Sequence, residues 1–323
     1  MPKFTAKAHA IQGLVKYHGL RDKQLRLPYH DSISVCAQAL TTTTTIETST
    51  ELSNDSMEIN NSAANEREAA RILAVINPLR KLAKTKIHFK LKSSNNLAQA
   101  KGLGFSAAAF ASIAFASNNV LGLKLDLEHL SEYARLGAGS ASRSLVGGFS
   151  IWFAKRNGRS FARQLEGGKH LKLAMGIVPI ASQIKTDMAH EESVNSPFFS
   201  ARLREVKPIL KRMQLAIQKG DLDQVCQMAE TESLSLHAIT MTGNTGLILM
   251  SPDTIRVIQR IRHLRSEEHI PVWYSLDTGP SVYINTHPEH LDSVYDDIKQ
   301  NTGLSLLKST VGGPAQQTHD HLF

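Results

Sequence analysis

The segment NNLAQAKGLGFSAAA, residues 95–109, decides the fold more than any other stretch of this chain. Its glycine-containing loop, KGLGFS, leads directly into an alanine-rich segment with high helix propensity. At the start of a helix, the backbone N–H groups and the helix dipole both favour an anion. The stretch therefore predicts a phosphate-binding loop, although on its own the pattern is equally typical of a simple turn before a helix.

Around this loop, apolar periodicity predicts a mixture of strands and helices. Strands are expected over 3–8, 41–49, 272–276 and 282–284, and helices over 65–83, 126–137, 203–217, 252–264 and 291–298. Asp126 and the pair Ser251-Pro252 are typical helix starts. The polar stretch 50–64 is expected to be a hairpin tip or a surface loop. A composition shift near residues 178–187 favours two domains, 1–182 and 183–323.

Composition excludes several classes of protein. The chain has 323 residues, 41% of them hydrophobic and 20% charged, which is typical of a globular protein. We find neither an apolar run long enough to span a membrane nor a signal peptide, and two cysteines fit a reducing cytoplasm. The net charge of +8 is spread along the chain and is not interleaved with aromatic residues. We therefore expect no membrane partner and no nucleic acid.

Three further motifs place the loop in a family. They are GLVKYHGLRD (13–22), GAGSASRSLVGGF (137–149) and YSLDTGPSVYI (274–284). Together with the loop, and in this order, they resemble the decarboxylases of the mevalonate pathway, which belong to the GHMP kinase superfamily. The resemblance implies an α+β, two-lobed fold, with an N-terminal lobe like a ribosomal-protein domain and a ferredoxin-like C-terminal lobe.

The first motif resembles the family pattern ALIKYWGKRD, whose first lysine matches Lys16. By that resemblance Lys16 lies in the active site near Asp277, and the adjacent Tyr17 contacts the substrate. The second lysine of the pattern, which helps diphosphate-using relatives hold the diphosphate, is Leu20 here. Losing a cation weakens charge-assisted phosphate binding, so the motif favours a 5-monophosphate and resembles the archaeal phosphomevalonate decarboxylases.

The phosphate loop departs from the family pattern PTAAGLASSA. The proline is Ala98 here, and Phe105 replaces the first serine of the pair, so that Ser106 alone remains. Either Phe105 turns into the core while the backbone and Ser106 hold ATP, or ATP does not bind and the substrate arrives already phosphorylated on its 3-oxygen. The residues predicted to hold phosphate or ATP are Lys101, Gly102, Gly104 and Ser106.

The remaining site residues also follow from the resemblance. Arg143 matches the arginine that holds the substrate carboxylate, a role that suits its bidentate fork, and Asp277 matches the catalytic aspartate of the pattern TIDAGPN. The stretch 184–199 resembles the family segment SSREGM…TSPFY. The residues predicted to bind substrate are Tyr17, Ser140, Ser142, Lys185 and Met188. No spacing among the 14 histidines predicts a metal site in the protein itself.

The predicted activity is that of a carboxy-lyase acting on mevalonate 5-phosphate, with ATP and Mg2+, to give isopentenyl phosphate in the cytoplasm. The alternatives are an ATP-independent decarboxylase of mevalonate 3,5-bisphosphate and a diphosphomevalonate decarboxylase. Two alternatives belong to other functional classes. One is a kinase that does not decarboxylate, and the other is a basic nucleic-acid-binding module on an old enzyme scaffold. Lys16, Arg143 and Asp277 argue against both. A homodimer is an open possibility.

Overall fold

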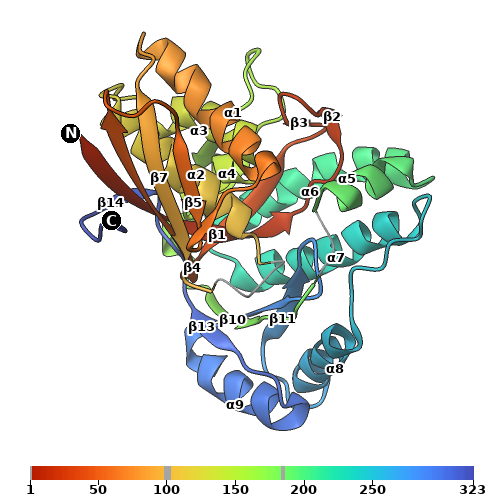
Figure 1. Cartoon of the computed structure of the whole chain (residues 1–323). Helices are drawn as coiled ribbons and strands as arrows, with labels where there is room; N and C mark the ends of the chain where they lie inside the picture. Colours follow the sequence, from red (N-terminus) through yellow and green to blue (C-terminus); the bar gives the residue numbers. More distant parts are fainter. Residues whose placement is uncertain (1, 98–102, 183–185) are drawn as a thin grey trace.

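The structure is a computed structural model that describes residues 2–97, 103–182 and 186–323. Two antiparallel-rich sheets, each with its own helices, form two lobes (Figure 1). The first sheet follows the spatial order β14 (Gln316–Thr318), β1 (Lys3–Val15), β4 (Ser32–Ser49), β7 (His88–Asn95), β5 (Ser56–Ile59) and β6 (Ser62–Ala63). From β4 it extends also to β8 (Phe149–Trp152) and then β9 (Ala162–Gln164).

Helices cover one face of this first sheet (Figure 1). They are α1 (Glu66–Leu82), α2 (Phe105–Val120), α3 (Leu127–Gly137) and α4 (Ala141–Val146). The predicted caps are confirmed, because the Asp126 side chain accepts from the His129 N–H at the start of α3. The alanine-rich α2 is buried along most of its length against β1 and β4, since small side chains allow a helix to lie close to a sheet.

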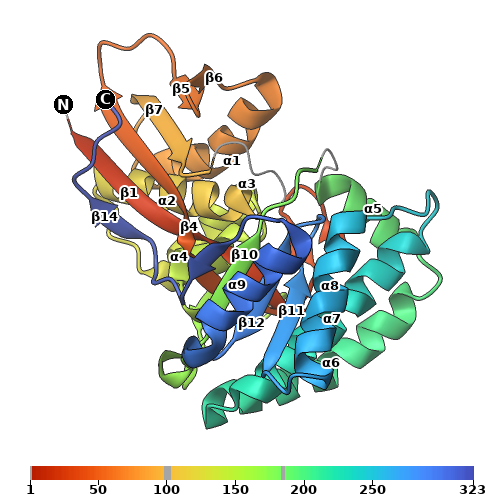
Figure 2. The same ribbon diagram turned by 90° about the horizontal axis from the view of Figure 1, so that it is seen from below.

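The second sheet has both faces covered. Its order is β11 (Val272–Leu276), β12 (Val282–Thr286), β10 (Ala174–Val178) and β13 (Leu307–Ser309). Successive strand residues point to opposite faces. Tyr274 accordingly joins one core, with α8 (Pro252–Ser266) and α9 (Leu291–Thr302), whereas Trp273 joins the other. That other core includes residues of α6 (Phe199–Lys219) and α7 (Leu222–Met241), the helices drawn beside β11 in Figure 2. It is continuous with the core of the first lobe.

Some elements differ from those expected. The polar stretch 50–64 forms the hairpin β5–β6, with Asn60 and Asn61 in the left-handed region at φ 49° and 63°, as a tight hairpin turn requires. Strand β7 was not predicted, and β1 and β4 are longer than expected. The division of the chain at 182/183 stays a prediction, although β10 already belongs to the second sheet and β14 returns to the first.

Three short elements complete the fold near the opening between the lobes. Strands β2 (Leu20–Asp22) and β3 (Leu27–Pro28) form a small hairpin directly after the first motif. Helix α5 (Thr186–Asn195) lies at the same opening and packs against α6 and α7. No helix within the described ranges is both long and apolar enough to cross a membrane.

Candidate active site

A cavity of about 580 Å³ between the two lobes collects most of the residues predicted from the sequence. One wall comes from the end of β1 and from α1, α2 and α4, and the other from α5, α7 and the turn after β11. The predicted residues that line it are Lys16, Tyr17, Gly104, Ser106, Ser140, Arg143 and Asp277.

Other predicted residues lie elsewhere. Ser142 is fully buried in α4, where its hydroxyl donates to the Gly139 carbonyl at 2.8 Å, and it does not line the cavity. Met188 is 49% exposed on α5, outside the lining. Lys101, Gly102 and Lys185 fall outside the described residues.

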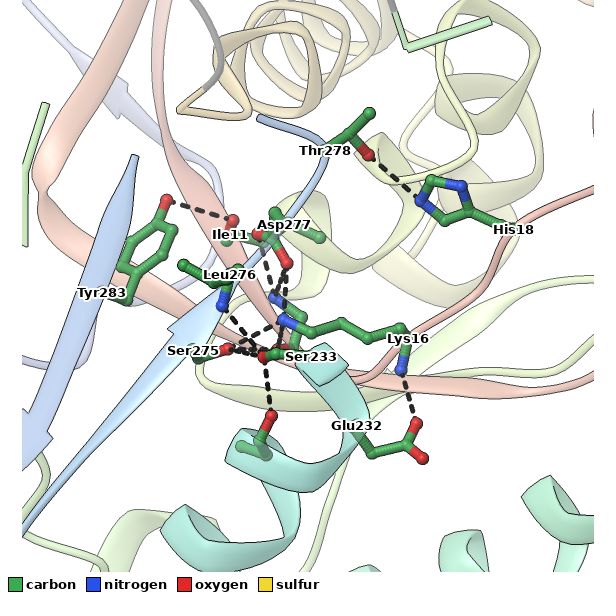
Figure 3. A network of polar contacts seen from close by, with 12 residues as sticks. Ile11, Lys16, His18, Glu232, Ser233, Ser275, Leu276, Asp277, Thr278 and Tyr283 are labelled. Carbon is green, nitrogen blue, oxygen red and sulfur yellow. Dashed lines mark hydrogen bonds and ion pairs between the residues drawn. The ribbon is translucent and has the colours of Figure 1, made fainter. Parts of the chain in front are cut away.

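Lys16 and Asp277 form a close ion pair at the base of the cavity (Figure 3). The Lys16 Nζ lies 2.7 Å from Asp277 Oδ1 and also donates to the Ser275 hydroxyl at 2.8 Å. Both carboxylate oxygens accept from the Gly13 N–H, at 3.1 and 3.2 Å. Burial lowers the pKa of the Lys16 ammonium, and the facing carboxylate opposes that shift. Lys16 and Gly13 thus fix the Asp277 side chain in place, with part of it open to the cavity.

A second, fully buried ion pair holds the backbone at Lys16. Arg202 on α6 and Glu232 on α7 pair through both guanidinium nitrogens and both carboxylate oxygens. The same two side chains bind the Lys16 peptide group, since Glu232 accepts from its N–H at 3.1 Å and Arg202 donates to its carbonyl at 2.9 Å. The segment that follows β1 is therefore tied to the helices of the second lobe.

Arg143 is buried in α4 with unused hydrogen-bonding capacity. It is 2% exposed, and its Nε and Nη1 have no hydrogen-bond partner in the described structure. Its guanidinium lies over the rings of Tyr17 and Trp152, at 5.2 and 5.9 Å from their centroids. Burial lowers the pKa of this group. An unpaired buried guanidinium facing a cavity is costly unless an anion binds there.

Neutral aromatic and imidazole groups line the middle of the cavity. Tyr17 stacks near His190, with ring centroids 5.2 Å apart, and burial raises the pKa of its hydroxyl. His190 accepts the Gly19 N–H at Nδ1, and burial lowers its pKa to about 4. His18 meets the Thr278 hydroxyl at 3.1 Å through Nε2, and burial keeps its pKa well below the usual value. These histidines are neutral at physiological pH.

The far end of the cavity is rich in arginine. Three arginines form an arginine cluster here: Arg26 in the turn between β2 and β3, and Arg67 and Arg71 on α1. Asp187 on α5 pairs with Arg67 and lies 3.9 Å from Arg26. Arg71 is oriented by donating its Nε to the Gly137 carbonyl at 3.0 Å. Glu68 also reaches this rim but is engaged at the start of α1, where it accepts the Asn65 N–H.

The start of α2 lines one side of the cavity. Gly104 caps the helix at φ 71°, and a side chain there would crowd the Ile11 carbonyl at 3.3 Å. Phe105 packs into the hydrophobic core and is 9% exposed, whereas Ser106 is exposed at the cavity. Phe105 is thus buried, as the first of the two explanations requires, while the binding of ATP at this loop stays a prediction.

Several residues of this site were not found by sequence reasoning. Arg202 and Glu232 lie about two hundred positions from Lys16 in the chain, so no local pattern connects them. Asp187 could have been found from the sequence, because it replaces the glycine of the family segment SSREGM with a charged residue. No feature of the sequence points to Arg26. Its unusual backbone conformation, with φ at 50°, becomes visible only in the structure.

Comparisons with known proteins agree with this geometry. Residues 8–162 match the family described as diphosphomevalonate decarboxylase-like N-terminal domain, and residues 185–317 match the mevalonate 5-diphosphate decarboxylase C-terminal domain. A phosphomevalonate decarboxylase from Haloferax volcanii is 40% identical over 317 residues, 97% of both chains. A mevalonate 3,5-bisphosphate decarboxylase from Thermoplasma acidophilum is 30% identical over 69% of this chain and 54% of its own length.

Solved structures give the same result. The complex of MDDEF with MVAPP, AMPPCP and magnesium has a TM-score of 0.91 at 27% identity and covers 98% of both chains. The predicted α+β GHMP fold is confirmed by this likeness.

Proposed function

Because the chain belongs to the family of mevalonate-pathway decarboxylases, which are carboxy-lyases, we propose that it converts mevalonate 5-phosphate to isopentenyl phosphate. The observation that carries this proposal is the distribution of charge in the cavity. One end holds Arg143 and the Lys16–Asp277 pair, and the other end holds the arginine cluster. A short molecule with a carboxylate at one end and a phosphate at the other matches both ends.

Arg143 is proposed to bind the carboxylate. Its Nε and Nη1 lack partners, and a guanidinium fork suits a carboxylate bidentately. The Tyr17 ring lies between this end and the far end, since the charges of Arg143, Arg26, Asp187 and Arg71 all act on its hydroxyl. The carbon chain of the substrate would lie along this ring and the neutral imidazole of His190.

Asp277 is proposed to accept the proton of the 3-hydroxyl. Its Oδ2 is not used by Lys16, and Gly13 and Lys16 hold the carboxylate in place. The 3-oxygen must leave as phosphate, because hydroxide is a poor leaving group. When the C3–O bond breaks, its electron pair leaves with the phosphate. The C1–C2 bond then supplies the pair that forms the C2–C3 double bond, and CO2 departs. Buried cations beside the departing anions stabilise this charge separation.

ATP is proposed as the phosphoryl donor, with magnesium. The start of α2 fits a nucleotide phosphate, because Phe105 is turned into the core and leaves the backbone and Ser106 facing the cavity. When bound, ATP supplies the phosphoryl group that converts the 3-hydroxyl into a leaving group. Within the described part of the chain, no cluster of three His, Cys, Asp or Glu residues is placed to hold a metal, so we propose that the phosphates carry most of the magnesium ligands.

The choice of a 5-monophosphate is supported by Leu20, which stands in the place of a phosphate-binding lysine, and by the 40% identity to a phosphomevalonate decarboxylase. The resemblance to the Thermoplasma protein keeps the 3,5-bisphosphate as the main competitor. We also propose a cytoplasmic location, which two buried, unpaired cysteines suit, and no nucleic-acid partner. Whether the protein is a homodimer is a question for light scattering.

Product analysis tests the proposal directly. The protein is incubated with mevalonate 5-phosphate, its 5-diphosphate or its 3,5-bisphosphate, each with and without ATP and Mg2+, and CO2 and the alkene product are measured. We expect CO2 from the 5-phosphate only with ATP. CO2 from the bisphosphate without ATP, combined with no turnover of the 5-phosphate, would replace this function by the ATP-independent one. Phosphorylation without CO2 would make the protein a kinase.

A further inference from the structure

The arginine-rich end of the cavity has a wall that it shares with a second cavity. Arg26, Asp187 and His190 line both the main cavity and an adjoining one of about 490 Å³. Leu20 and Lys23 line only the adjoining cavity. A ligand that extends beyond the main cavity at this end would therefore have to pass Arg26 and Asp187.

Two arginines at this wall have unused donors. The Arg26 side chain is 17% exposed, and its polar contact with a described residue is the 3.9 Å approach to Asp187, which is too long for a hydrogen bond. Arg71 uses its Nε on Gly137, and its guanidinium lies over the Phe110 ring at 4.7 Å. Its terminal nitrogens make no hydrogen bond to a described residue. Gly137 and Phe110 thus hold Arg71 in place, and both arginines have donors that make no hydrogen bond to a described residue.

Asp187 places a negative charge among these donors. Its carboxylate pairs with Arg67 and faces Arg26, and the side chain is 46% exposed. Burial alone would raise the pKa of this carboxyl, but Arg26, Arg67 and Arg71 together lower it. Asp187 is therefore ionised at neutral pH and adds a fixed negative charge beside the phosphate-binding arginines.

We propose that Asp187 is a specificity determinant, which admits one phosphate group beside the arginine cluster and disfavours a second. This inference rests on the proposed function, because it takes the far end as the site of the 5-phosphate. A single phosphate is satisfied by the free donors of Arg26 and Arg71. A second phosphate would bring further negative charge toward the Asp187 carboxylate and toward the apolar Leu20 beyond it. Like charges brought together in a partly buried site are costly, so the wall discriminates by repulsion.

The test is equilibrium binding of mevalonate 5-phosphate and its 5-diphosphate, measured by calorimetry. Asp187→Asn should improve the affinity for the diphosphate relative to the monophosphate by about tenfold, the order expected for removing one close like charge. Glu191→Gln is the matched control, since it removes the same charge from the same helix at a residue that lines only the adjoining cavity. That variant should leave the ratio of affinities within about twofold of the wild type, because the Glu191 side chain is 58% exposed and solvent and salt largely screen its charge.

A second variant checks that the phosphate lies here at all. Arg26→Gln should weaken binding of the 5-phosphate about tenfold, as expected for a lost charge-assisted contact. Equal ratios for Asp187→Asn and Glu191→Gln would overturn the proposal, and so would unchanged 5-phosphate binding in Arg26→Gln. The proposed function fails separately, if the wild type binds the 5-phosphate but releases no CO2 from it. Binding therefore decides the role of Asp187 whatever the turnover assay gives.

Discussion

Replacing Arg143 by methionine should make the ligand-free protein more stable while abolishing its chemistry. Two unpaired N–H groups of this buried guanidinium cost roughly 1–3 kcal/mol each. Its two cation–π contacts with the rings of Tyr17 and Trp152 together stabilise the fold by about 1–2 kcal/mol. Methionine is shorter but has a similar volume, and it has no N–H groups that need a partner. We therefore expect Arg143→Met to raise the free energy of unfolding by about 2 kcal/mol.

Thermal melting without substrate measures the first effect, and CO2 release measures the second. The matched control is Arg202→Met, which removes another buried arginine, one that is paired with Glu232. That variant leaves a buried carboxylate without its partner, so it should lose about 3–5 kcal/mol. Opposite signs for the two variants are the prediction. If the Arg143→Met protein melts below the wild type, Arg143 stabilises the ligand-free fold. That result would refute the argument that this guanidinium is left unpaired in order to bind an anion. Arg143→Lys should not restore activity, because a point charge does not reproduce the fork.

Asp277→Asn should reduce turnover by about 100-fold or more with the fold intact, as expected for the loss of a positioned base, and near-normal CO2 release would contradict the assignment. Leu20→Lys should shift the ratio of kcat/KM values toward the 5-diphosphate by about tenfold, since an added ammonium can meet a second phosphate; a wild type that already prefers the diphosphate would refute the reasoning. Acid should destabilise the protein between about pH 6.5 and pH 4. Burial lowers the pKa values of His30, His190 and His237 to about 4, so the unfolded chain binds protons in this window while the folded chain does not. Each such histidine should lower the free energy of unfolding by up to about 1.4 kcal/mol for each pH unit below about 6.5. Urea unfolding at several pH values measures this loss. A free energy of unfolding that stays constant across the window would show that these side chains are not buried as neutral groups.

The resemblance of three motifs to the family was sufficient to find the residues that we propose carry the chemistry. Lys16, Arg143 and Asp277 belong to three motifs far apart in sequence, and the structure places all three at one cavity. The helix starts at Asp126 and Ser251 could also be predicted, because capping depends on residues within one turn.

Features that depend on distant partners could not be predicted in this way. In β7, HFKLKSSN, apolar Phe89 and Leu91 alternate with lysines, and the sequence analysis places no strand there. Its pairing with β4 and β5 shows that the apolar positions face the core. Likewise, nothing near Lys16 in the chain indicates that Arg202 and Glu232 hold its peptide group. Those contacts exist only after both lobes have assembled.

The pairing of β14 with β1 also affects the order in which the two sheets can be completed during synthesis on the ribosome. Thr318 pairs with Thr5, so one edge of β1 stays open until almost the whole described chain has been synthesised. Domains of a nascent chain generally fold in the order in which they emerge, but here the second sheet receives its last strand, β13, before the first sheet receives β14. Throughout that interval the open edge of β1 is a place where other strands can add. The sheet that begins first is the one completed last.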